Sequence, residues 1–278
     1  GAPANVVCAL RKLEVPAAFI GCLGDDEYGR EFIRLFQQLN INIDFLQIAK
    51  QASTRIVKVM RDESGDRSFS GFEVTKSSSF ADEMLDKLLL NTNIKNLKKL
   101  FLNTKYIVTG TNLLAFSQSS DALYFILDFA KKFKIKIIID VNWREIFWEN
   151  SNIDKDAKLK KVKKFLHHAD ILKLANEEAY LFFNTSDPSE ISKVLIKQPD
   201  VIITNGAKPI NWYLNGIKGS NEVVKHTSKI VDTTGAGDAF LAGLISRYYL
   251  NSNLDNHSKI KENIKFASVC GLLTCFGE

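Results

Sequence analysis

The stretch "VDTTGAGDAF" (231–240) decides how this chain is expected to fold and act, because it places two glycines before a carboxylate where a helix begins. Gly235 and Gly237 permit unusual dihedral angles and close approach of a ligand to the backbone. A loop that enters a helix offers free N–H groups and a positive dipole end, so the stretch predicts an anion cradle. Asp238 would repel a merely bound phosphate, but it would serve as a base for a hydroxyl that attacks phosphorus. The alternative is a structural one, an aspartate at a helix start behind turn glycines, and no "GxxxxGK[ST]" P-loop motif occurs.

The rest of the chain alternates short β-rich runs with amphipathic helical runs. Such alternation predicts an α/β protein with a mostly parallel sheet, helices on both faces, and ligands at the carboxyl ends of the strands. Two alternating runs at 55–72, around Ser64-Gly65-Asp66, break this rhythm and predict a β-hairpin that stands off the sheet as a flap. The predicted strands are 17–22, 106–110, 135–140, 170–175, 200–205, 211–214 and 222–226, and the predicted helices are 27–39, 121–133, 156–168, 177–183, 237–250 and 261–275.

The composition is that of an ordinary globular protein. The length of 278 residues predicts one domain with a small appendage, and the net charge of +5 is mild for that length. The lysine run at 158–164 alternates with Leu159, Val162 and Leu166 at helical spacing, which favours the wet face of a helix over a nucleic-acid patch. No secretory signal and no apolar run long enough for a bilayer is found, so we expect a cytoplasmic protein without membrane or nucleic-acid partners.

The four cysteines, Cys8, Cys22, Cys270 and Cys275, show no CxxC spacing, and His167 and His168 have no metal-ligand partners nearby in the sequence. Free buried thiols in a reducing compartment are therefore expected.

Two long motifs in register carry a family resemblance. "DTTGAGDAFLAGL" (232–244) resembles the C-terminal signature of the ribokinase-like (PfkB) carbohydrate kinases, and "GAPANVVCALRKLEVPAAFIGCLGDDEYGREF" (1–32) resembles their N-terminal signature. The resemblance implies one kinase domain over 1–278, in a three-layer ribokinase-like fold, with a small β lid at about 52–74. It also implies ATP-dependent phosphorylation of a sugar hydroxyl with Mg²⁺, with Asp238 as catalytic base and the N–H groups of Gly235, Ala236 and Gly237 as the anion hole for the phosphoryl group.

Other site residues follow from the same resemblance. "DVNWREIFW" (140–148) resembles the family's D-x-N-x-R segment, with Asn142 facing the sugar and phosphates and Arg144 neutralising phosphate charge; a surface arginine with a packing tryptophan is the alternative. Glu178 in "KLANEE" (173–178) matches the acidic position that organises water around Mg²⁺, although Ala175 replaces the usual Asn or Ser and a solvated helix-start Glu is an equal alternative. Asn5, with Gly1 and Ala2, is implied to bind the sugar, and a helix-capping Asn5 is the alternative.

The nucleotide contacts implied by the resemblance are Thr204, Gly206, Gly235, Gly237 and Ser268. Thr204 and Gly206 in "ITNGAKP" (203–209) match the family's nucleotide loop, but Pro209 replaces its second glycine. Ser268 occupies a position near the adenine that is often Asn. The family's first strand and its acidic sugar-binding residue would precede Gly1, so both ends of the domain are expected to be missing.

The expected substrate is a neutral sugar, because Glu73 stands where many relatives have an arginine that would favour an anionic one. The leading hypothesis is a fructokinase that forms fructose 6-phosphate. A 2-keto-3-deoxygluconate kinase is the alternative from the same class, and a non-catalytic kinase-like regulatory or binding protein is the alternative from a different class, favoured by the departures at Glu73, Ala175, Pro209 and Ser268. The resemblance further allows a monovalent cation such as K⁺ and a homodimer through the lid.

Overall fold

A six-stranded sheet forms the centre of the molecule. A computed structural model describes residues 1–61, 67–73, 79–149, 154–227, 229–250 and 256–277. The strand order is β10-β9-β8-β7-β6-β5, in which β5 to β8 are parallel while β9 and β10 run antiparallel at one edge. The strands are β5 (Tyr106–Thr109), β6 (Lys136–Asp140), β7 (Ile171–Ala175), β8 (Asp200–Asn205), β9 (Lys208–Leu214) and β10 (Ile217–Asn221). The predicted mostly parallel sheet is confirmed.

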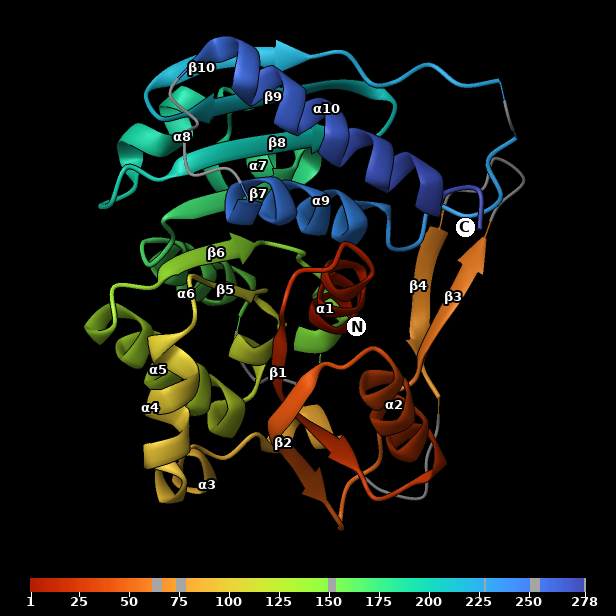
Figure 1. Cartoon of the computed structure of the whole chain (residues 1–278), viewed down its shortest axis with the longest axis vertical. Coiled ribbons are helices and arrows are strands. Elements are labelled where there is room, and N and C mark those ends of the chain that lie inside the picture. Colours follow the sequence, from red (N-terminus) through yellow and green to blue (C-terminus); the bar gives the residue numbers. More distant parts are fainter. Residues whose placement is uncertain (62–66, 74–78, 150–153, 228, 251–255, 278) are drawn as a thin grey trace.

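Helices cover both faces of this sheet, and the alternation of side chains along each strand decides which residue meets which layer. Ile138, Ile171 and Ile202 pack with α1 (Ala2–Lys12), α9 (Ala236–Leu250) and α10 (His257–Thr274). Their neighbours Ile137, Leu172 and Ile203 pack with the opposite layer. That layer contains α3 (Lys87–Thr92), α4 (Ile94–Leu102), η2 (Asn112–Ala115), α5 (Ser117–Lys132), η3 (Glu145–Trp148), α6 (Lys155–Leu166), α7 (Asn176–Phe183) and α8 (Pro188–Val194). Figure 1 shows α9 and α10 (blue) crossing one face, so the predicted three layers are confirmed.

A second, two-stranded parallel sheet pairs β1 (Ala18–Gly24) with β2 (Asn42–Ala49) around α2 (Glu27–Gln38). The predicted strand at 17–22 and helix at 27–39 lie here. The sequence did not indicate β2, because "NIDFLQIA" mixes exposed and buried side chains without a clean period of two.

The predicted flap is an antiparallel pair, β3 (Val57–Arg61) and β4 (Arg67–Phe72), followed by η1 (Ala81–Met84). It stands apart from the main sheet, as Figure 1 shows in orange. Val57 pairs with Phe72 at its root. The predicted turn at Ser64-Gly65-Asp66 and residue 74 of the predicted lid fall outside the described ranges.

One predicted strand is wrong. Residues 222–226 form no strand, and the edge strand is β10 instead. The cause is the β9–β10 turn at Asn215 and Gly216, whose φ values of 50° and 77° are those of a tight hairpin, so pairing resumes at once at Ile217. The helix predicted at 261–275 likewise begins earlier, because the Asn256 side chain caps α10 by accepting a hydrogen bond from Lys259 N at 2.9 Å.

Other expectations concern the surface and the thiols. On α6, Val162, Phe165 and Leu166 are buried while Lys160, Lys163 and Lys164 are exposed, as the helical spacing predicted. All four cysteines are free, but only Cys22 and Cys275 are buried; Cys8 and Cys270 are half-buried. Across the described ranges, no helix is long and apolar enough to cross a bilayer, and no three His, Cys, Asp or Glu side chains gather as a metal site needs.

Candidate active site

The start of α9 has the geometry of an anion-binding helix terminus. Gly235 precedes the helix with φ of +82°, a left-handed conformation that favours glycine. Among the described residues, no acceptor meets the backbone N–H of Gly235, Gly237 or Asp238, whereas Ala236 N donates to Thr233 O at 3.2 Å. The four residues are all half-buried, so these N–H groups lie at an accessible surface rather than in the packed interior.

Asp238 lies in the first turn of α9 and is joined to α1. Asn5 Nδ2 donates to Asp238 Oδ2 at 2.8 Å, so the starts of α1 and α9 meet. Burial raises the pKa of the Asp238 carboxyl, and the hydrogen bond from Asn5 only partly offsets this rise. A raised pKa suits a general base, since it makes the carboxylate a better proton acceptor.

The residues predicted to bind sugar lie at the start of α1. Gly1 is the N-cap of the helix and is exposed, Ala2 is half-buried, and Asn5 is exposed. The alternative of a helix-capping Asn5 is wrong, because Asn5 lies inside α1 and its side chain binds Asp238 instead.

Glu178 joins the two loops that follow β6 and β7. Its carboxylate accepts hydrogen bonds from Trp143 N at 2.6 Å and Ala175 N at 2.8 Å, and it is buried. Burial raises the pKa of Glu178, which Asp140 raises further. The alternative of a solvated helix-start glutamate is therefore wrong: Glu178 holds the loop of Asn142 and Arg144 against the start of α7.

Asn142 and Arg144 lie in that loop at the carboxyl end of β6. Asn142 has φ of +40°, which turns the chain sharply away from the strand. Arg144 donates from Nη1 to Trp143 O at 2.7 Å and is half-buried, so it is not the fully exposed surface arginine of the alternative. The predicted contacts of both residues with a ligand stay predictions.

The predicted nucleotide residues are distributed over three elements. Thr204, one residue before the end of β8, pairs with Ala175 of β7, and Gly206, with φ of +53°, lies in the tight β8–β9 turn. Pro209 falls in β9 beside a register shift, where a missing N–H is tolerated. Ser268 is buried within α10, which leaves little of its side chain to touch an adenine, and its predicted role stays a prediction.

The "GDD" motif (24–26) connects β1, α2 and the root of the flap through hydrogen bonds and close packing. Asp26 caps α2 by accepting from Gly29 N at 2.8 Å, and its other oxygen accepts from Thr54 N at 2.6 Å. An ideal Cβ on Gly29 would collide with Gly24 O, and one on Gly24 would lie 2.6 Å from Thr54 N. The two glycines are therefore needed for close packing, and the motif fixes the residue before Arg55.

Arg55 is a residue that the sequence analysis missed. Its side chain is 7% exposed; Nε donates to both Asp82 oxygens at 2.9 and 3.1 Å, and Nη2 donates to Glu83 at 2.6 Å. It also lies over four phenylalanine rings from separate parts of the chain, at 4.1–5.1 Å from their centroids: Phe72, Phe80, Phe116 and Phe147. This cluster, the Arg55 clamp, joins the flap root to the body, and no local sequence signal marks it.

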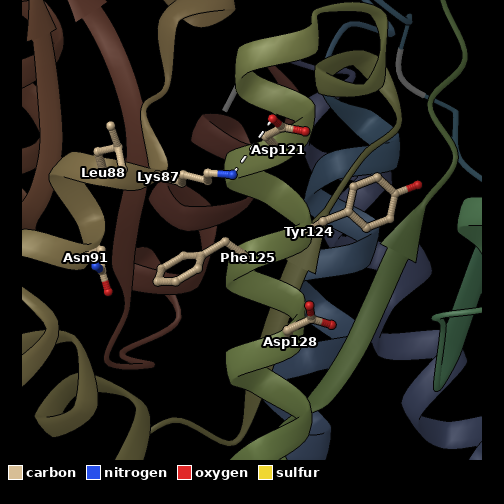
Figure 2. A pocket seen from close by; sticks show the side chains of 7 residues that line it. All are labelled: Lys87, Leu88, Asn91, Asp121, Tyr124, Phe125 and Asp128. Carbon is tan, nitrogen blue, oxygen red and sulfur yellow. Dashed lines mark ion pairs between the residues drawn. The ribbon is translucent and has the colours of Figure 1, made fainter.

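Two cavities described in the structure lie away from these residues. One of about 410 Å³ lies between α3 and α5, where Figure 2 shows Lys87 of α3 pointing toward Asp121 of α5, with Phe125 and Asp128 further along the same helix. The other, of about 730 Å³, lies beside the α7–α8 loop and β10 and includes Asp187 and Lys218. Neither contains a predicted site residue.

These features define an α/β protein in which unbonded backbone N–H groups at the start of a helix lie beside a carboxylate that could accept a proton. A model of the pfkB family of carbohydrate kinases matches residues 1–277. The chain therefore belongs to the pfkB family, has a ribokinase-like fold, and is a phosphotransferase that acts on a sugar hydroxyl.

Several of the proteins similar to this chain are fructokinases. Probable fructokinase-5 of Arabidopsis thaliana is 31% identical over 276 residues, covering 98% of this chain and 80% of the relative. Fructokinase-2 of Oryza sativa subsp. japonica is 29% identical over 278 residues, covering 98% and 78%. Fructokinase from Vibrio cholerae O395, solved in fructose, ADP and calcium ion bound form, matches with 27% identity and a TM-score of 0.78 over 99% of this chain and 84% of that one. Fructokinase with bound ATP from Xylella fastidiosa, 23% identical with a TM-score of 0.81 over 99% and 84%, agrees in fold.

Proposed function

We propose that this protein is a fructokinase that transfers the γ-phosphoryl group of ATP to a hydroxyl of fructose, giving fructose 6-phosphate and ADP. The observation that carries the proposal is the pairing of Asp238 with unbonded N–H groups at the start of α9, within reach of Asn5 from α1. The fructokinase relatives and the fructose- and ADP-bound structure support the choice of substrates.

In the proposed mechanism, Asn5 and the start of α1 hold the sugar with one hydroxyl near Asp238. The Asp238 carboxylate takes the hydroxyl proton while the sugar oxygen forms a bond to the γ-phosphorus and the bond from that phosphorus to the β–γ bridging oxygen breaks, releasing ADP. The N–H groups of Gly235 and Gly237 stabilise the charge on the phosphoryl oxygens. Ala236 N would join them by releasing Thr233 O.

Mg²⁺ is proposed as the metal, with Glu178 touching it through water. The donor set fits this arrangement: each Glu178 oxygen accepts one backbone N–H and keeps a further lone pair. Mg²⁺ retains most of its waters and uses few protein carboxylates when phosphates bind it. The metal, when bound, neutralises phosphate charge. Thr204, Gly206 and Ser268 are proposed nucleotide contacts, and Asn142 and Arg144 are proposed to face the sugar and phosphates.

The charge at the flap root favours a neutral sugar. The hydrogen bond from Asn5 holds the Asp238 carboxylate near the start of α1. Arg55 is paired with both Asp82 and Glu83, and Glu73, nearby on the chain, is exposed. The root therefore carries an excess of negative charge that would disfavour a phosphorylated sugar or the carboxylate of 2-keto-3-deoxygluconate.

The test is a sugar panel with wild-type protein and the Asp238→Asn variant, measuring sugar-dependent ADP release. Fructose should give the highest kcat/KM, and 2-keto-3-deoxygluconate and fructose 6-phosphate should give far lower values. The variant should turn over fructose about 10²–10⁴-fold more slowly than the wild type. Preference for the ketoacid would assign the alternative kinase activity. ATP binding without turnover on any sugar would favour a non-catalytic protein.

The remaining expectations are kept as proposals. A chain 26% identical to this one is a fructokinase variant from Vibrio cholerae O395 solved with fructose, ADP and potassium ion, which supports K⁺ as a further cation near the anion hole. One kinase domain with its lid at about 52–74, pairing of lids in a homodimer, and a cytoplasmic location complete the proposal.

A further inference from the structure

A buried ion pair lies beneath the candidate active site. Lys173 on β7 and Asp140 on β6 are register partners on neighbouring strands, and they are 5% and 6% exposed. Lys173 Nζ donates to both Asp140 oxygens, at 3.0 and 2.9 Å. Replacing such a pair by apolar side chains is often neutral or stabilising, so stability alone does not explain its presence.

The position of the ammonium group connects the pair to α9. Side chains alternate along β7, so Lys173 faces the same layer as Ile171, which packs with α9 and α10. Lys173 Nζ lies 3.4 Å from the place that a Cβ on Gly237 would occupy. The charge therefore touches the first turn of α9, one residue before Asp238.

Lys173 is the cation in a cluster of carboxylates. Asp238 accepts a hydrogen bond from Asn5 on α1, and Asp140 on β6 and Lys173 on β7 both lie close enough to shift its pKa. Asp140 raises the pKa of Asp238 and of Glu178, and Lys173 lowers both. Hydrogen bonds to Asp140 use two of the three ammonium hydrogens, and the third meets no acceptor among the residues described.

We propose that Lys173 is a positioning residue for phosphoryl transfer: held by Asp140, its ammonium fixes a positive charge under the first turn of α9, where it offsets the nearby carboxylates and favours the anionic phosphoryl group. This inference rests on the proposed function. The chemistry agrees, because a preorganised charge in a water-poor site needs no rearrangement when charge develops in the transition state.

The test uses two single variants with opposite expected effects. In Lys173→Met the lost cation raises the pKa of Asp238, so the acidic limb of the kcat profile moves to higher pH by roughly 1 unit, and kcat falls about tenfold or more at little changed sugar KM. In Asp140→Asn the lost anion lowers that pKa, so the limb moves to lower pH. A purely structural pair would lower the folded fraction in both variants and leave both limbs in place.

Asp140→Asn/Lys173→Met is the folding control, because it removes both charges at nearly constant volume. It should melt within a few degrees of the wild type and still show kcat lowered about tenfold. Wild-type kcat in this double variant would overturn the proposal.

A ¹³C NMR titration of the Asp238 carboxyl measures the same pKa changes without turnover. The Asp238 signal is assigned because it disappears in Asp238→Asn. Opposite shifts in the two single variants support the role of Lys173 even if no sugar is phosphorylated. If the pKa of Asp238 is the same in both folded variants as in the wild type, the proposed role of Lys173 is wrong, whether or not the protein is a fructokinase.

Discussion

Replacing Arg55 by methionine should destabilise the protein strongly, because it breaks the Arg55 clamp at its centre. The change keeps most of the aliphatic length but removes three charge-assisted hydrogen bonds to Asp82 and Glu83 and the cation above four rings. Removing one partner of a buried ion pair costs about 3–5 kcal/mol. Because Asp82 and Glu83 are partly exposed and regain water, the low end of that range, about 3 kcal/mol, is expected.

The assay is urea unfolding, with Arg30→Met as the matched control. Arg30 also pairs with a carboxylate, Asp25, but at 3.4 Å and with the arginine side chain 60% exposed. Such a surface pair contributes at most about 1 kcal/mol, so the control should lie close to the wild type. Equal losses in the two variants would refute the clamp. Because the clamp also anchors the flap, Arg55→Met should raise the KM for sugar, and the control should not.

Three further predictions concern the start of α9. Gly235→Ala forces alanine into a φ of +82°, so this variant should lose about 1–2 kcal/mol of stability and most of its kcat. Gly216→Ala, at a φ of +77° in the remote β9–β10 turn, is the control and should lose similar stability at unchanged kcat. Equal kcat values for the two variants, compared at equal folded fraction, would contradict this. Gly271→Ala would place its Cβ 2.8 Å from Ala236 O, so the start of α9 must shift, and kcat should fall in a protein that still folds, as circular dichroism can check. Because burial raises the pKa of Asp238, activity should fall on acidification through a pKa above that of an ordinary aspartate. The stability contributed by this group runs the other way: it is present at low pH and is lost as the pH rises from the ordinary aspartate pKa through the raised one. Asp238→Asn should therefore gain stability relative to the wild type over that rise, and parallel stability curves for the two proteins would contradict this.

The sequence predicted the main sheet well because its strands are continuous apolar runs. "IKIIID" and "DVIITN" are buried on both faces, which leaves few other structures open to them. The sequence-based predictions failed where tertiary contacts, rather than the local hydrophobic pattern, determine the strand. β2 mixes exposed and buried positions, and the edge strand after β9 was misplaced because the Asn215-Gly216 turn is shorter than expected.

The candidate site was predictable where one motif contains its parts. Gly235, Gly237 and Asp238 are adjacent in sequence, so their chemistry can be inferred from spacing alone. Asn5 reaches Asp238 across 233 positions, and the family resemblance was needed to relate them. Lys173 and the Arg55 clamp depend on which strands are neighbours and on four distant phenylalanines, information that no local pattern holds.

The central claim is that the start of α9 holds the phosphoryl group while Asp238 takes the proton of the sugar hydroxyl. The most direct measurement is single-turnover ³¹P NMR of ATP, Mg²⁺ and fructose with wild-type protein and Asp238→Asn. The account predicts a phosphate ester and ADP from the wild type, and a rate about 10²–10⁴-fold lower from the variant with ATP binding unchanged. Ester formation by the variant at the wild-type rate, or release of inorganic phosphate alone by the wild type, would contradict it.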